Sequence, residues 1–146
     1  MNKIDMTIIT NKFFRRMKNY PDAINRGNCF NWAMAAYIYF RGRGYDVRLL
    51  SDSENCHAFV EIDGVYYDSE TPCGTNDFTE LECYRINQID VGHVSEHSQK
   101  EFLKRWREEW PHTRHGKNRV WGPVLIRKII GKTAKVPRIA APSYFG

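Results

Sequence analysis

The chain has 146 residues, of which 42% are hydrophobic and 27% are charged. This balance excludes an intrinsically disordered chain, and the length predicts a single globular domain over residues 1–146 with a sizeable core. Because no apolar run approaches the roughly 18 residues of a membrane span and the first twenty residues lack the apolar stretch of a secretory signal, we expect a cytoplasmic protein that does not enter membranes.

Positive charge is concentrated at the C-terminal end. The net charge is +5, yet no acidic residue follows Glu109, whereas eight of the 22 Lys and Arg residues do. The first 109 residues hold 14 basic and 17 acidic residues. A basic C-terminal third on a mildly acidic body predicts an acidic partner, which could be a nucleic acid, another polyanion or an acidic protein surface. The alternative is a solvated basic surface that only keeps the protein soluble.

The N-terminal part of the chain is predicted to be helical. Apolar residues at roughly helical spacing predict a short helix before Tyr20, and residues 21–27 are predicted to form a loop. A second helix is predicted over about residues 28–41 and is ended by two glycines. The residues that recur on its buried face are Cys29, Ala33, Ala36 and Phe40.

Strands are predicted to follow this helix. The alternating stretch 45–50 predicts one strand, and residues 57–62 and 65–68 predict a hairpin. Asp63-Gly64 separates the last two segments, and this dipeptide favours the positive φ angles of a tight hairpin turn. An antiparallel arrangement is therefore predicted for this part of the sheet.

The C-terminal half is predicted to alternate between strands and a helix. The segment 81–90 (LECYRINQID) predicts a strand or a strand pair, and 119–130 predicts a last strand. Between them, Ser98 and Glu101 form a capping box before a helix to about Trp110. The residues predicted to line the buried face of this helix are Leu103, Trp106 and Trp110. The whole order predicts an α+β fold with an antiparallel sheet and an irregular tail at 137–146.

Three residues form a constellation that suits nucleophilic catalysis. Cys29 is predicted at a helix start, where the helix dipole and a nearby imidazolium favour a thiolate. His57 begins one strand of the hairpin, and Asp68 ends the other, so the carboxylate can orient the imidazole. Tyr66, Asp68 and Glu70 share one face of their strand, which leaves Glu70 as the alternative carboxylate.

The stretches NCFNWA and CHAFVEIDGVYYDSE resemble the papain-like and transglutaminase-like cysteine superfamily over about residues 27–70. The resemblance implies a central helix that carries the Cys and packs on an antiparallel sheet. It also implies acyl transfer through a thioester, as in peptide hydrolysis, deamidation or transamidation, on a protein or peptide and without a cofactor. Cys29 would be the nucleophile, His57 the base and acid, and Asp68 the group that orients the imidazole.

The resemblance also indicates where an oxyanion and a substrate would bind. Asn25 and Asn28 are the candidates for an oxyanion-binding side chain, together with the backbone N–H of Cys29. Trp32 and Tyr66 are the candidates for substrate contact. The acidic residue is followed by Ser-Glu in place of the proline turn common in the family, so the choice between the two carboxylates stays open.

Less specific interpretations compete with a catalytic site. Cys29 would then be a buried apolar residue, and the protein a binding or inhibitory module that keeps the fold without the chemistry. A nucleic-acid binder acting through its basic C-terminal third is a further alternative.

The other cysteines and histidines are not predicted to bind metal. Nine residues separate Cys73 from Cys83, whereas zinc modules use roughly two to four. His93 and His97 are predicted to be exposed ahead of the C-terminal helix. Cys56 precedes His57 and is predicted to face away from it. All four thiols of the chain are expected to be free.

Overall fold

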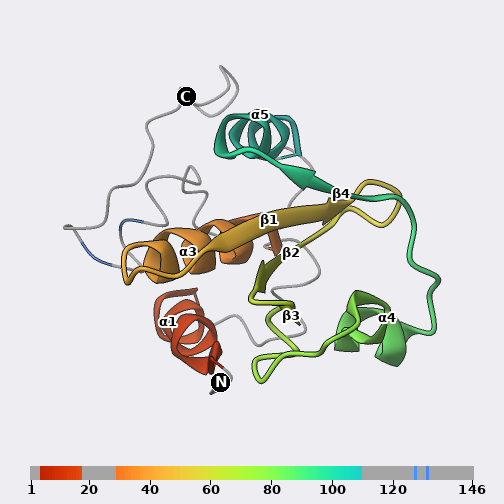
Figure 1. The fold of residues 1–146 in the computed structure, drawn as a ribbon, viewed down its shortest axis with the longest axis horizontal. Helices are drawn as coiled ribbons and strands as arrows, with labels where there is room; N and C mark the ends of the chain where they lie inside the picture. Colours follow the sequence, from red (N-terminus) through yellow and green to blue (C-terminus); the bar gives the residue numbers. More distant parts are fainter. Residues whose placement is uncertain (1–3, 18–28, 110–126, 128–130, 132–146) are drawn as a thin grey trace.

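The computed structural model describes residues 4–17, 29–109, 127 and 131 (Figure 1). In this part of the chain, four strands form one antiparallel sheet in the order β3-β2-β1-β4, and helices cover both of its faces. The predicted α+β class with an antiparallel sheet is therefore confirmed. The elements are α1 (Thr7–Met17), α3 (Cys29–Arg41), β1 (Val47–Asp52), β2 (His57–Ile62), β3 (Val65–Tyr67), η1 (Phe78–Glu80), α4 (Glu82–Asn87), β4 (Val94–His97) and α5 (Gln99–Glu109).

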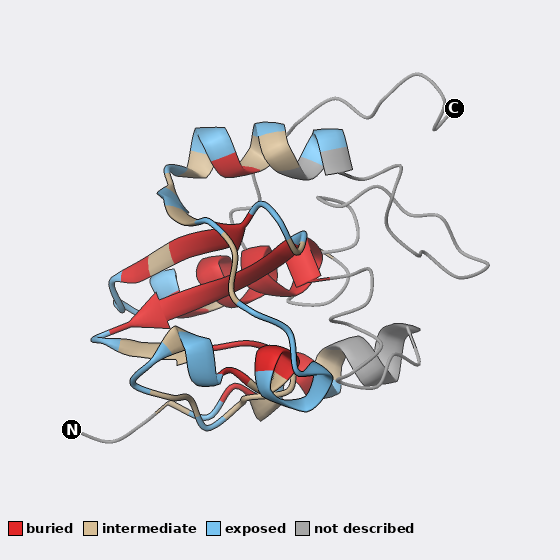
Figure 2. Ribbon diagram, turned by 90° about the vertical axis from the view of Figure 1, so that its right-hand side faces the viewer, coloured by how far each residue is buried: buried red, intermediate tan, exposed pale blue. Residues whose placement is uncertain are grey.

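Helix α3 packs across one face of the sheet and forms the centre of the main core (Figure 2). It is buried on almost every side, with only Tyr39 and Arg41 reaching solvent, so the predicted single buried face is too narrow. Its alanines allow close approach to β2, while Ile9 of α1 and Phe102 of α5 join the same core cluster from other sides. This nearly complete burial makes α3 a closely packed support for its first residue, Cys29.

The opposite face of the sheet carries a second apolar cluster, built from Leu50, Phe59, Leu81 and Tyr84. Side chains alternate along each strand, so Leu50 points to this cluster while its neighbour Leu49 points to α3. Since η1 and α4 cover this second face, residues at odd positions of β2, from His57 onward, face α4 and not the body of α3.

The hairpin between β2 and β3 forms as predicted. Ile62 pairs with Val65, and the two turn residues have φ angles of 52° at Asp63 and 78° at Gly64. These positive angles are those of a type I′ turn. Strand β1 lies two residues later than predicted and extends to Asp52, which pairs with His57.

The strand predicted over 81–90 is wrong, because residues 82–87 form helix α4. Glu82 and Arg85 make an ion pair at i, i+3 spacing, and Gln88 ends the helix in the left-handed conformation with a φ angle of 53°. Local helical contacts and this C-terminal cap outweigh the apolar residues that suggested a strand.

Strand β4 was not predicted, and it changes the position of His97. The residue was expected to be exposed, but it is half-buried in β4 and lies 2.6 Å from Ser51 Oγ through its Nε2 atom. The expectation fails because Ser95 pairs with Ser51 of β1 and brings this polar segment into the sheet. His93 is exposed as predicted.

Helix α5 begins with the predicted capping box. The Glu101 backbone N–H donates to Ser98 Oγ over 3.2 Å, and the Ser98 hydroxyl donates to the Glu101 carboxylate. Phe102 is fully buried and Leu103 is half-buried, whereas the Trp106 side chain and residue 110 lie outside the described part of the chain. Most of the strand predicted over 119–130 also lies outside it, but Arg127 is helical and its carbonyl accepts from Gly131 N–H.

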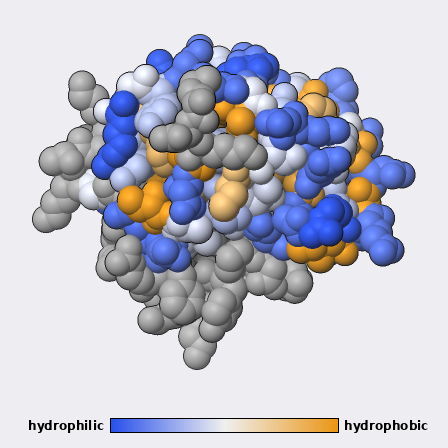
Figure 3. Space-filling view, turned by 60° about the horizontal axis from the view of Figure 1, so that its bottom comes forward, coloured by the Kyte–Doolittle hydropathy of each residue, from blue (hydrophilic) through white to orange (hydrophobic). Residues whose placement is uncertain are grey.

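The surface seen from the side of α1, β3 and α4 is mainly hydrophilic, with small hydrophobic groups between the polar side chains (Figure 3). Among the residues described, the large hydrophobic side chains that are exposed are Ile8, Tyr45, Ile86 and Ile89. No helix in the described ranges is both long and apolar enough to cross a bilayer.

Candidate active site

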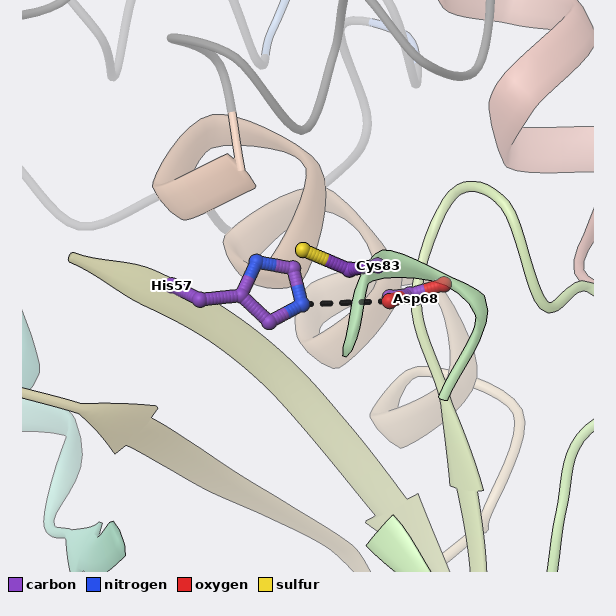
Figure 4. Close-up of side chains that lie close together, drawn as sticks. All are labelled: His57, Asp68 and Cys83. Atoms are coloured by element: carbon purple, nitrogen blue, oxygen red, sulfur yellow. Dashed lines mark hydrogen bonds and ion pairs between the residues drawn. The ribbon is translucent and has the colours of Figure 1, made fainter. Parts of the chain in front are cut away.

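A buried imidazole–carboxylate pair lies where β2 begins and β3 ends. His57 Nε2 and Asp68 Oδ2 are 3.1 Å apart, and neither side chain is more than 2% exposed (Figure 4). The other carboxylate oxygen of Asp68 accepts a hydrogen bond from Glu70 N–H over 3.0 Å. Each carboxylate oxygen of Asp68 therefore has a hydrogen-bond partner, and this geometry holds the imidazole in one orientation.

The register of the hairpin explains why the imidazole meets Asp68. Val60 pairs with Tyr67, so a longer ladder would bring Glu70 opposite His57. Strand β3 ends at Tyr67, however, and the chain turns through Thr71, whose N–H donates to Asp68 O. The carboxylate of Asp68 therefore reaches His57 diagonally, while the described contact of Glu70 in this network is its backbone N–H.

Cys29 is the first residue of α3 and is 4% exposed. Its thiol donates a hydrogen bond to the carbonyl oxygen of Cys56 over 3.3 Å, so it lies at the same end of β2 as His57. Cys56 has a φ angle of 50°, in the left-handed region, just before the strand begins. The start of α3 and the start of β2 therefore meet at this thiol.

Cys83 is the residue of this site that sequence reasoning missed. Its sulfur lies beside the His57 ring, and its Sγ, a ring nitrogen of His57 and a carboxylate oxygen of Asp68 all lie within 4.8 Å of one another (Figure 4). The sequence predicts a strand at this residue, and its possible co-ligands for a metal do not include His57 or Asp68. They are Cys73, His93, His97, His112 and His115. A helix predicted over residues 82–87 would have placed Cys83 on its buried side. The structure has Cys83 in this position.

The surroundings of His57 favour its charged form. Burial lowers its pKa, but the hydrogen bond to Asp68 and the neighbouring thiols of Cys29 and Cys83 outweigh this effect and hold the pKa well above its ordinary value. Nδ1 makes no hydrogen bond within the described residues, although both thiols lie close to the ring. The arrangement therefore offers an imidazolium next to two buried sulfur atoms.

Asp52 provides a second buried carboxylate, which is linked to the site through Tyr84. Asp52 is fully buried, and its carboxylate accepts hydrogen bonds from Asn55 Nδ2, from the Tyr84 hydroxyl and from the backbone N–H groups of Glu54 and Gly92. The Tyr84 ring stands edge-on to the His57 ring, with 5.7 Å between their centroids. Asp52 thus joins the turn that leads into β2 to the helix that carries Cys83.

The remaining predicted site residues lie in different places. Trp32 is 1% exposed and donates from Nε1 to Thr10 Oγ1, so it belongs to the core. Tyr66 is half-buried and packs against Phe59 and Phe78 on the second face of the sheet. Asn25 and Asn28 fall outside the described residues. Cys56 is exposed, and none of the four cysteines forms a disulfide, as expected.

Compared with protein-family models, with characterised proteins and with solved structures, the chain matches none.

Proposed function

We propose that the protein is a cysteine-nucleophile enzyme that acts on amide bonds through a thioester, with a papain- or transglutaminase-like core. The observation that carries this proposal is the buried His57–Asp68 pair next to Cys29 at the start of α3. Support also comes from the chain order Cys, His, Asp and from the packing of the helix that carries the Cys on an antiparallel sheet.

The chemistry follows from the positions of these groups. An imidazolium and a helix N-terminus both stabilise the Cys29 thiolate, which attacks the carbonyl carbon of an amide. The amide nitrogen leaves as an amine after it takes the proton of His57, and a thioester with Cys29 remains. Water or a second amine, deprotonated by His57, then attacks the thioester and frees Cys29. The backbone N–H of Cys29 is a donor for the oxyanion.

Three further parts of the proposal rest mainly on the sequence. The substrate is a protein or peptide, and the basic C-terminal third, which lies almost entirely outside the described residues, binds an acidic surface of it or of a partner. The protein works in the cytoplasm, since four free thiols suit a reducing compartment.

The proposal is tested by the alkylation rate of each cysteine, measured by mass spectrometry from about pH 5 to 9 with the protein free of metal. We expect Cys29 to keep its rate at low pH, whereas exposed Cys73 loses about a factor of ten per pH unit below its pKa. The variant His57→Ala should remove the advantage of Cys29.

Two results would count against this assignment. If Cys29 follows the pH profile of Cys73 in the wild type, it is an ordinary thiol and the catalytic proposal fails. If Cys83 is the thiol that reacts at low pH, the nucleophile has been assigned to the wrong sulfur. Circular dichroism of His57→Ala shows whether a lost rate reflects chemistry or unfolding.

A further inference from the structure

The side chains of His57, Asp68 and Cys83 bring three different donor atoms to one buried point. They come from the start of β2, from the residue after β3 and from α4, and they are 1%, 0% and 8% exposed. A ring nitrogen, a carboxylate oxygen and a sulfur within 4.8 Å of one another form a mixed donor set (Figure 4). Segments that are far apart in sequence supply it, so the spacing of cysteines along the chain could not reveal it.

These donors suit a thiophilic divalent cation. Zn²⁺ binds Cys sulfur at about 2.3 Å and His nitrogen or carboxylate oxygen at about 2.0–2.2 Å, which separates neighbouring donors by roughly 3.3–3.6 Å in a tetrahedron. His57 Nε2 and Asp68 Oδ2 are already 3.1 Å apart. Because all three donor atoms lie within 4.8 Å of one another, Cys83 Sγ needs to approach the other two by roughly 1.2–1.5 Å at most to reach this tetrahedral separation.

The surroundings of the three donors are ordered before any ion binds. Glu70 N–H holds the second oxygen of Asp68, and the rings of Phe59 and Tyr84 restrict the His57 imidazole from two sides. The Tyr84 hydroxyl is fixed on Asp52, so the segment of α4 next to Cys83 is anchored as well. Outer contacts of this kind orient metal ligands and raise affinity.

We propose that His57, Asp68 and Cys83 bind one Zn²⁺ ion, with a fourth position left for water or another ligand. The ion takes the place of the thiol proton of Cys83 and of the proton on the coordinating ring nitrogen, and both protons pass to solvent. An occupied site removes the imidazole from acid–base chemistry, so Zn²⁺ inhibits any reaction that uses His57. Binding itself does not depend on the proposed function.

The test is a calorimetric titration of the full chain with Zn²⁺ in a thiol-free reductant. We expect one equivalent to bind to the wild type and Cys83→Ser to weaken that binding by roughly 100-fold or more. The matched control is Cys73→Ser, which changes an exposed thiol outside the cluster and should bind as the wild type does. Circular dichroism confirms that each variant is folded.

Several outcomes would overturn the site. They are no binding to the wild type, equal binding by Cys83→Ser and Cys73→Ser, and loss of binding in Cys29→Ser but not in Cys83→Ser. If Cys83→Ser does not fold, Co²⁺ bound to the wild type decides, because a thiolate ligand gives a sulfur-to-cobalt charge-transfer band and its absence rejects Cys83 as a ligand. Metal-free alkylation of Cys29 is a separate readout, so either proposal can fail alone.

Discussion

Tyr84 ties α4 to the end of β1 by donating its hydroxyl hydrogen bond to Asp52 Oδ2 over 2.8 Å. The same carboxylate accepts from Asn55 in the turn before β2 and from Gly92 before β4. One buried side chain therefore holds the positions of three segments, and two of them border His57 and Cys83. Substitutions that remove the negative charge of Asp52 test this role.

We expect Asp52→Asn to reduce the free energy of unfolding by about 1–3 kcal/mol near neutral pH, because an amide cannot accept all the hydrogen bonds that a carboxylate accepts. Denaturant titration measures the loss. The control Asp46→Asn, at an exposed position, should change stability by no more than about 0.5 kcal/mol. Equal effects of the two variants would contradict a structural role for Asp52.

The same variant should change the acid limb of the stability curve. Burial raises the pKa of Asp52, but its hydrogen bonds with Asn55, Gly92 and Tyr84 outweigh this effect, so its folded pKa lies below 3.8. The carboxylate therefore stabilises the fold above pH 3.8, and this contribution is lost as the pH falls through the folded pKa. The difference between wild type and Asp52→Asn should accordingly shrink in acid, which unfolding titrations at successive pH values would show.

Asp68→Asn should lower the pKa of His57, because the hydrogen bond to the Asp68 carboxylate raises that pKa against the opposing effect of burial. In the wild type the raised pKa stabilises the fold below about pH 6.5, and this contribution disappears as the pH rises through the folded pKa. NMR titration of the imidazole, with a chelator present, measures the shift. An unchanged His57 pKa in Asp68→Asn would show that the carboxylate does not control the ring.

Two glycines with the same φ angle offer a matched pair of substitutions. Gly64 and Gly74 both have a φ angle of 78°, but a Cβ at Gly64 meets nothing within 4 Å, whereas one at Gly74 lies 2.3 Å from Val65 Cγ1 and 2.7 Å from the Tyr67 ring. We expect Gly64→Ala to cost about 1 kcal/mol and Gly74→Ala about 2–4 kcal/mol. Thermal unfolding measures both losses of stability. If the two losses are similar, the loop at Gly74 can move to make room for the added Cβ.

Ser98→Ala should destabilise the protein by about 1 kcal/mol, because it removes the side-chain acceptor for Glu101 N–H at the start of α5. The control Lys100→Ala, at an exposed position of the same turn, should leave stability within about 0.5 kcal/mol of the wild type. Denaturant titration distinguishes the two expectations. If Lys100→Ala loses as much stability as Ser98→Ala, the loss does not come from the Ser98 cap.

Local signals predicted part of the fold. The apolar spacing behind Cys29 and the Asp63-Gly64 turn depend on near neighbours in sequence, so α3 and the β2–β3 hairpin could be predicted. Helix α4 and strand β4 could not. Cys83 lies in six residues whose helical state depends on end contacts and on packing against the sheet. His97 gains its position from pairing with Leu49 of β1, 48 residues earlier in the chain.

The site, like the fold, could be predicted only where it depends on residues close together in the sequence. His57 and Asp68 belong to one hairpin, so their proximity follows from its register and from the early end of β3. The contact between Cys29 and the start of β2 depends on how α3 packs, which the sequence indicates only through the resemblance. The approach of Cys83 depends on the Asp52 network, whose members are spread over four segments of the chain.

The thiol of Cys29 and the imidazole of His57 are coupled through the backbone of one dipeptide. Cys56 supplies the carbonyl oxygen that accepts from Cys29 Sγ, and the next residue along the chain is His57 itself. A residue inserted into the turn at 53–56 would displace the carbonyl and the ring together. This turn therefore sets the alignment of the sulfur and the ring, and its length is the single parameter that an engineer of this site would need to leave unchanged.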